Sequence, residues 1–277
     1  MSAEQKPWIS ECIKHEIEPL KFETHKYKTD EKEFIIHFFE IHEITPSLKN
    51  YIDSKICGIA KGIQRAVTLQ KVKKEILTFI ERKYQNSSIE NSTTAIGAIA
   101  EFFIHLFLSL QEYKQECLYL NLEENSIKKG FDGVYSKADE IWIMESKSGL
   151  STTNNISHQG KLSDAYTDLK AKLMGESQND PWENAYHHAM CARSDQDIVD
   201  FIEQAISNAD KNDYKPMSEY NLMPSATIFY DGKCKTFNKT NIEKKIIEKI
   251  NTFESKQIHF ICVSKKSLDL FINYLKG

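Results

Sequence analysis

The hydrophobic positions of the chain fall into two patterns, short apolar runs and stripes with helical spacing. Runs rich in β-branched and aromatic residues predict strands at residues 33–42, 116–122, 130–135, 140–147, 225–230 and 258–263. Apolar residues that recur every three or four positions predict helices at residues 46–59, 68–83, 94–110, 158–173, 194–208, 238–253 and 267–275. Thr45 before Pro46 is typical of a helix start. A strand meander followed by strand–helix–strand units predicts an α/β fold.

The helix predicted at residues 94–110 has the clearest periodicity in the chain. Beside its apolar stripe, Gly97, Glu101 and His105 form a second stripe with a spacing of four residues. A glutamate in so apolar a helix is either half exposed or has an important partner. His105 lies one turn after Glu101, and we expect a core histidine with a hydrogen-bond partner.

A polar stretch at residues 84–91 is the best candidate for a boundary within the chain. It divides the chain into an N-terminal strand and helical extension, residues 1–90, and a core, residues 91–277. The extension would pack on the core or face a partner, and a single domain is the alternative. Residues 1–30 are polar and mixed, and no strand or long helix is predicted there.

Composition and charge are those of an ordinary soluble globular protein. The 277 residues are 40% hydrophobic and 27% charged, with a formal net charge of -4. This charge excludes a protein that coats nucleic acid by charge alone, so a nucleic-acid enzyme would need local lysines or a partner. The longest apolar stretch, residues 99–110, contains Glu101 and His105 and is too short to span a membrane. We expect a cytoplasmic protein without a membrane partner.

Cysteine usage also indicates an intracellular protein. The chain has no CxxC pair, and we expect reduced thiols rather than disulfides. The six cysteines are Cys12, Cys57, Cys117, Cys191, Cys234 and Cys262. His187 and His188 with Cys191 suggest zinc, but adjacent histidines diverge in either a helix or a strand, so structural zinc is disfavoured.

Residues 130–149 contain the strongest candidate chemistry. Asp132 opens one short hydrophobic run, and Glu145 and Lys147 close the next. Glu145 and Lys147 are two positions apart, so in a strand their side chains point to the same face.

The turn between these two strands decides where Asp132 lies. If Lys137 and Ala138 form the turn, Asp132 pairs with Ile143, beside Glu145 on the same face. One surface of the sheet would then carry two carboxylates and an ammonium group. Such a cluster is costly to bury unpaired, so it requires a metal ion or a phosphate.

Two carboxylates and a lysine suit the hydrolysis of phosphodiester bonds. Carboxylates hold a hard divalent cation such as Mg²⁺ or Mn²⁺, which lowers the pKa of bound water and neutralises charge on the phosphate. Lys147 would position that water or stabilise the transition state, and Glu101 would add a ligand from the preceding helix. The alternative is a solvated salt-bridge pair on a strand. Gly130 and Gly133 beside Asp132 favour the catalytic interpretation.

The ordered set of motifs resembles the PD-(D/E)xK nuclease core. That core has a helix with Glu, a strand with Asp, a strand that ends in ExK, and then a helix. GxxxEFF, GFDGVY and IWIMESKS are most similar to the nuclease subunit of Hachiman anti-phage systems, the HamA-like proteins. The similarity continues into the helix KLSDAYTDLKAKL and the strand IHFICV. It covers residues 94–175 well and the C-terminal part loosely.

The resemblance implies a restriction-endonuclease-like fold, in which helices flank a mixed central sheet. It also implies a metal-dependent DNA nuclease that works with a superfamily 2 helicase subunit (HamB-like), which senses damaged or foreign DNA. By position, Asp132 and Glu145 would be ligands of Mg²⁺ or Mn²⁺, and Lys147 the catalytic lysine. Glu101 would be the fourth member of the catalytic set and a further metal ligand.

Two other functions remain open at this point. One is a non-catalytic subunit that clamps DNA or regulates the helicase, although such a subunit need not keep Asp132, Glu145 and Lys147 together. The other is a stand-alone restriction-type endonuclease. That enzyme would need its own specificity domain, and none is evident after residue 175.

Overall fold

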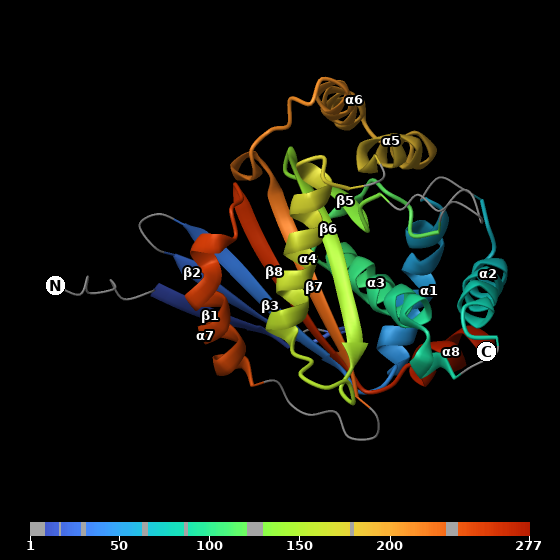
Figure 1. Ribbon diagram of the computed structural model, residues 1–277. Helices are drawn as coiled ribbons and strands as arrows, with labels where there is room; N and C mark the ends of the chain where they lie inside the picture. The colour runs from blue at the N-terminus through green and yellow to red at the C-terminus, as the bar shows by residue number, and fades with distance from the viewer. Residues whose placement is uncertain are drawn as a thin grey trace.

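Eight strands form one mixed sheet in the order β1-β2-β3-β8-β7-β6-β5-β4 (Figure 1). The computed structural model describes residues 9–16, 18–28, 32–62, 66–85, 88–120, 130–177, 180–230 and 238–277. The strands are β1 (Ile9–His15), β2 (Phe22–Lys28), β3 (Glu33–Ile41), β4 (Lys114–Gln115), β5 (Gly133–Lys137), β6 (Glu140–Leu150), β7 (Asn221–Phe229) and β8 (Gln257–Lys265). The mixed sheet and its helices confirm the predicted α/β fold class.

The helices alternate with the strands in the second half of the chain. The α-helices are α1 (Pro46–Lys61), α2 (Leu69–Arg82), α3 (Thr93–Leu110), α4 (His158–Leu173), α5 (Pro181–Ala192), α6 (Gln196–Asp210), α7 (Lys239–Lys249) and α8 (Asp269–Lys276). Short 3₁₀ helices are η1 (Ile89–Asn91), η2 (Met217–Glu219) and η3 (Ile250–Thr252). As predicted, Thr45 caps α1 by accepting from the N–H of Leu48.

Strand directions divide the sheet into three parts. At one edge, β1, β2 and β3 are antiparallel. In the middle, β3, β8, β7 and β6 are parallel. At the other edge, β6, β5 and β4 are antiparallel. The N-terminal strands therefore belong to the same sheet as the C-terminal strands. The boundary near residue 90 stays a prediction.

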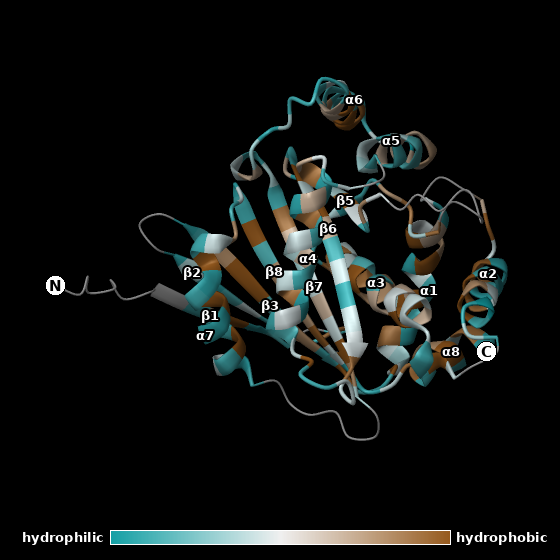
Figure 2. Cartoon of the chain, in the orientation of Figure 1, coloured by the Kyte–Doolittle hydropathy of each residue, from teal (hydrophilic) through white to brown (hydrophobic). Residues whose placement is uncertain are grey.

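Helices cover both faces of this sheet. One hydrophobic cluster joins α1, α2, α3 and α8 to side chains such as Trp142 and Met144 of β6. A second cluster joins α4, α5, α6 and α7 to the opposite face, which includes Ile143. In Figure 1, α4 and α7 lie in front of the sheet and α3 lies behind β6. The arrow-headed half of β6 is white and teal in Figure 2, which marks a polar segment between these layers.

Helix α3 is the core helix of one layer. It has 18 residues and is long and apolar enough to cross a membrane by length and composition alone. The prediction that the apolar run is too short was therefore wrong. In the structure 67% of this helix is buried against other parts of the chain, which is the environment of a core helix. The helix begins one residue before the predicted start and ends at the predicted residue.

The strand predicted at residues 116–122 is wrong for the residues that are described, 116–120. Its backbone N–H groups bind other partners, because Tyr119 donates to Ile59 O and Leu118 donates to Nδ1 of His188. The two-residue strand β4 ends just before this segment. Asp231 and Gly232, whose residue types predict a turn, lie outside the described residues.

The sequence interpretation missed β1, β2 and α5, as well as the short β4 and the 3₁₀ helices. Strands β1 and β2 lie at or near a sheet edge and contain several charged residues, which weaken their apolar pattern. Helix α5 has a recognisable start, since Asp180 accepts from the N–H groups of Trp182 and Glu183 and Pro181 is the first helical residue. The apolar periodicity that follows is weaker than in α3.

Helix α4 begins at an N-cap that can be tested. The hydroxyl oxygen of Ser157 accepts from the N–H of Gly160 at 3.3 Å. We expect Ser157→Ala to lower the free energy of unfolding by about 1 kcal/mol, because one N–H at the helix start loses its partner. Urea denaturation measures this value. Ser163→Ala, inside the same helix, serves as the control and should change it by less than about 0.5 kcal/mol. Equal stabilities of the two variants would contradict the role of the cap.

Candidate active site

The β5–β6 hairpin turns at Ala138 and Asp139, one residue later than predicted. Both residues have a positive φ, of 48° and 63°. A two-residue hairpin turn of this kind requires positive φ at both positions, and aspartate tolerates it. Lys137 pairs with Glu140 across the turn, which places opposite charges side by side.

This register corrects the position of Asp132. Its predicted pairing with Ile143 is wrong, because Val134 takes that place. Asp132 precedes the first paired residue of β5, and its Oδ2 accepts from the N–H of Ser146 at 2.9 Å. Asp132 therefore lies beside the peptide that joins Glu145 to Ser146.

Glu145 and Lys147 share one face of β6, as predicted, and α4 covers that face. The Glu145 side chain is almost fully buried, with 3% of the residue exposed. Lys147 Nζ lies 3.2 Å from Glu145 Oε1, and it also forms an ion pair with Asp168 of α4. Lys172, one turn further along α4, places its Nζ 2.5 Å from Glu145 Oε2. Both oxygens of Glu145 therefore contact an ammonium group.

Asp168 and Lys172 were missed as site residues by the sequence interpretation. Their spacing of four residues puts them on one side of α4, next to the buried Leu169 and Leu173. That spacing is a visible signal, but i,i+4 charge pairs are common on exposed helix faces. Only the packing of α4 on β6 directs this pair toward Glu145.

The pKa of Glu145 is strongly perturbed. Burial and the nearby charge of Asp132 raise it to about 7, although Lys172 and Lys147 act in the opposite direction. This carboxyl group is therefore harder to ionise than an ordinary glutamate. The ionisation of such a buried carboxyl group depends on the cations next to it.

The pKa of Lys147 is shifted upward. Partial burial alone would lower it, but the carboxylates of Glu145, Asp168 and Asp132 outweigh burial and raise it above its ordinary value. Lys147 is therefore a permanent cation at neutral pH. It is suited to stabilising negative charge and not to accepting a proton.

Glu101 approaches from the other side of the sheet, on α3. Its Oε1 lies 3.3 Å from Nε2 of His105, and Nδ1 of His105 contacts the hydroxyl group of Tyr135. Burial lowers the pKa of His105 to about 4, against the opposing effect of Asp132. The ring is therefore neutral at pH 7, and Nε2–H donates to Glu101 while Nδ1 accepts from Tyr135. His105 is a buried core histidine with partners, as expected.

The structure thus separates Glu101 from the other predicted site residues. Among the described residues, carboxylate oxygens of Glu101, Asp132 and Glu145 do not all lie within 4.8 Å of one another. The charges of Glu101 and Asp132 nevertheless act on the same group, because both help to raise the pKa of the buried Tyr135. Asp132, Glu145 and Lys147 form one cluster, and Glu101 stands behind it, on the side of Tyr135.

Two histidines near the candidate site or in the possible zinc group are structural. The ring of His158 is buried, and its Nε2 donates to Val263 O at 2.9 Å. His188 is also buried, with Nδ1 accepting from Leu118 N, whereas His187 and Cys191 are exposed. Within the described part of the chain these last three residues form no metal-binding group. The five cysteines that are described are free, and Cys234 lies outside the described residues.

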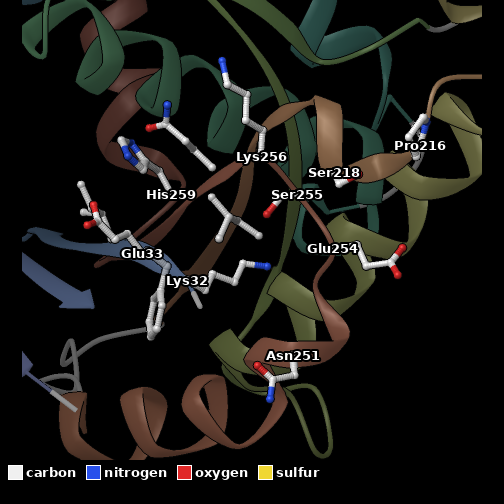
Figure 3. Close-up of a pocket in the computed structure, with 13 residues that line it drawn as sticks. Lys32, Glu33, Pro216, Ser218, Asn251, Glu254, Ser255, Lys256 and His259 are labelled. Atoms are coloured by element: carbon white, nitrogen blue, oxygen red, sulfur yellow. The ribbon is translucent and has the colours of Figure 1, made fainter. Parts of the chain in front are cut away.

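A pocket of about 780 Å³ lies elsewhere, where β3 and β8 begin (Figure 3). Its lining includes Lys32, Glu254, Lys256 and His259. None of the four predicted site residues lines it. The candidate site is therefore defined by its charged cluster and not by this pocket.

Comparisons with known proteins agree with the motifs on this hairpin and its flanking helices. Searches of the curated proteins and of the solved structures each found no significant match. The family model of HamA matches residues 6–276, which is nearly the whole chain and includes the β1–β3 edge as well as the candidate site. The chain therefore belongs to the HamA family, the Hachiman defence family that its motifs resemble.

Proposed function

We propose that this protein is the nuclease subunit of a Hachiman system, a metal-dependent enzyme that hydrolyses phosphodiester bonds of DNA. The observation that carries this proposal is the convergence of Asp132, Glu145 and Lys147 where β5 and β6 separate. Their order and spacing resemble the PD-(D/E)xK nuclease core, and membership of the HamA family agrees with that resemblance.

The residues of the cluster fit a hard divalent cation. Asp132 raises the pKa of the buried Glu145, so its carboxylate lies close enough to oppose the ionisation of Glu145. A cation between them would remove that conflict, and carboxylate oxygens are the ligands that Mg²⁺ and Mn²⁺ prefer. Asp132 and Glu145 would hold the ion, and Glu101 would support it from the α3 side. When bound, such an ion lowers the pKa of a water molecule and neutralises charge on the phosphate.

Lys147 supplies the positive charge that the transition state requires. Its raised pKa keeps the ammonium group charged at neutral pH, so it donates a hydrogen bond to a phosphate oxygen and does not act as a base. Asp168 and Glu145 hold this ammonium group in place from two directions. Of the two roles that the sequence allowed for Lys147, we therefore assign it the stabilisation of the transition state and not the positioning of the water.

Lys172 has a different role, as the cation that balances Glu145 before a metal binds. It contacts Glu145 Oε2 at 2.5 Å and lowers the pKa of that carboxyl group. By lowering the pKa of Glu145, Lys172 helps to keep this carboxyl group ionised, which is the form that would bind a metal ion. Lys172 is thus a positioning residue for the metal ligand.

Replacing Lys172 tests this role through pH. Lys172→Met removes a charge that lowers the pKa of Glu145, so the pKa should rise by about one unit. Because metal binding requires ionised Glu145, Mg²⁺-dependent cleavage should then need a higher pH for half of its maximum. A pH profile of cleavage at limiting Mg²⁺ measures the shift. Lys170→Met, on the exposed side of α4, is the control. A shift to lower pH in Lys172→Met would contradict the assignment.

In this proposal a helicase partner controls the nuclease activity. The formal net charge of -4 gives the chain little general affinity for DNA, which suits a subunit that a second protein brings to its substrate. By its resemblance to the family, that protein is a superfamily 2 helicase subunit. It would direct the nuclease to DNA or restrain it.

The direct experiment uses the purified chain and supercoiled plasmid DNA. We expect nicked or linear products with Mg²⁺ or Mn²⁺, and none with a chelator. The same assay with the helicase subunit added reports whether the partner restrains or directs cutting. A chain that binds DNA but leaves it intact under both conditions would instead indicate a DNA clamp.

A further inference from the structure

A second group of metal-ligating side chains lies at the other edge of the sheet, on β1 and β2, which are five and four strands away from β6. Cys12 of β1 is directly opposite His25 of β2 in the antiparallel ladder. Glu23 is two residues before His25, so both side chains point to the same face. One ligand atom from each of the three residues lies within 4.8 Å of the other two. In the described part of the chain, no other group of three metal-ligating residues is this close.

The distances within this group suit zinc. His25 Nε2 lies 3.3 Å from Cys12 Sγ and 3.2 Å from Glu23 Oε2. Tetrahedral zinc with ordinary bond lengths would separate sulfur and nitrogen by about 3.6 Å, and nitrogen and oxygen by about 3.3 Å. The sulfur–nitrogen and nitrogen–oxygen distances would therefore need to change by only a few tenths of an ångström, and all three ligand atoms already lie within 4.8 Å of one another. Cysteine, histidine and carboxylate are all normal zinc ligands.

Glu243 of α7 prepares His25 for this role. Its Oε1 lies within ion-pair distance of Nδ1 of His25. With its hydrogen on Nδ1, facing this carboxylate, the ring would offer the Nε2 lone pair to an ion between Cys12 and Glu23. A carboxylate behind a metal-binding histidine is the usual arrangement for fixing its tautomer and ring orientation. The ring edge of His25 also packs against Phe38 of β3, with centroids 5.2 Å apart.

The charges of the proposed ligands suit a zinc ion. Glu23 Oε2 lies 2.7 Å from Nζ of Lys239, whose side chain is 29% exposed and can turn toward solvent. A thiolate and a carboxylate together neutralise one zinc ion. Cys12 is exposed, which gives an ion a route to the site.

We propose that Cys12, Glu23 and His25 bind one zinc ion, with a water molecule in the fourth position and Glu243 as the hydrogen-bond acceptor behind His25. The site joins the β1–β2 hairpin to α7, which lies across β1, β2 and β3 in Figure 1. Its role is structural, because it holds the edge of the sheet to the helix that covers it.

The test uses the full chain, stripped of metal with a chelator, and Co²⁺ as a spectroscopic substitute for zinc. We expect one equivalent of Co²⁺ to give a thiolate-to-cobalt absorption band, and zinc to displace it. Cys12→Ser should abolish the band and His25→Gln should weaken zinc binding by more than about 10-fold. Glu243→Gln should weaken it by about 10- to 100-fold.

Two control variants separate this site from other possibilities. Cys191→Ser removes another exposed cysteine, and Asp132→Asn removes a ligand of the candidate active site; both should keep the band and the zinc affinity. Zinc should also raise the thermal unfolding temperature of the wild-type chain but not of Cys12→Ser. The proposal is overturned if the wild-type chain shows no band, or if Cys12→Ser binds zinc as tightly as the wild type. A loss of binding in Asp132→Asn alone would also overturn it.

Discussion

Lys147→Met is expected to reduce DNA cleavage by about 10²- to 10³-fold while the chain remains folded. Methionine keeps the length and apolar stem of the side chain and removes only the ammonium group. That group contacts Glu145 Oε1 at 3.2 Å and is held charged by three carboxylates. Its loss removes the one cation of the cluster assigned to the phosphate. Plasmid cleavage at saturating Mg²⁺ measures the effect.

Lys161→Met is a closely matched control for this substitution. The side chains of Lys147 and Lys161 are equally exposed, at 28%, and each forms an ion pair with an aspartate. Lys161 pairs with Asp164 at the start of α4, away from Glu145. Cleavage by Lys161→Met should match the wild type. Full activity in Lys147→Met with unchanged circular dichroism would refute the catalytic assignment.

Asp132→Asn should weaken Mg²⁺-dependent cleavage by about 100-fold or more. Even a residue that only supports a metal ligand typically costs 10- to 100-fold when it is replaced, so a direct ligand should cost more. The amide oxygen of asparagine can still accept from Ser146 N–H, so the hairpin geometry is kept. Titration of Mg²⁺ in the cleavage assay separates weaker metal binding from a slower reaction.

The same substitution predicts a pKa change with a defined sign. The charge of Asp132 raises the pKa of Glu145, so Asp132→Asn should lower it from about 7 by about one unit. Carboxyl titration by NMR in the metal-free chain measures this directly. Asp139→Asn, at the hairpin turn, changes the same residue type outside the cluster and should leave Glu145 unchanged. An unchanged Glu145 titration in Asp132→Asn would mean that the two carboxylates do not interact.

Sequence patterns predicted the central and covering elements well, because burial leaves a strong periodic signal. The apolar stripe of α3 gave its bounds to within one residue, and Pro46 marked the start of α1. Patterns failed at the sheet edge, where β1 and β2 contain several charged residues. They also failed at residues 116–120, whose N–H groups bind a helix end and a histidine from distant parts of the chain. Such partners are invisible to a local pattern.

Sequence patterns indicated which residue types form the candidate site, but not which of its side chains contact one another. Strand alternation correctly put Glu145 and Lys147 on one face. Asp132 was misplaced, because the turn type depends on backbone angles at Ala138 and Asp139 that no apolar pattern encodes. The contacts of Asp168 and Lys172 depend on how α4 packs across β6, which is a tertiary property.

The parallel pairing of β3 with β8 has a consequence for how the chain folds. Phe34 lies beside Ile258, more than 200 residues later in the chain. The edge formed by β1, β2 and β3 can therefore join the rest of the sheet only after β8, the last strand in the chain, has been synthesised. Until β8 arrives, β3 and β7 each have an unpaired edge, which is a surface prone to aggregation. The β5–β6 hairpin pairs residues that are close in the chain, whereas β6 also pairs with β7, more than 70 residues later.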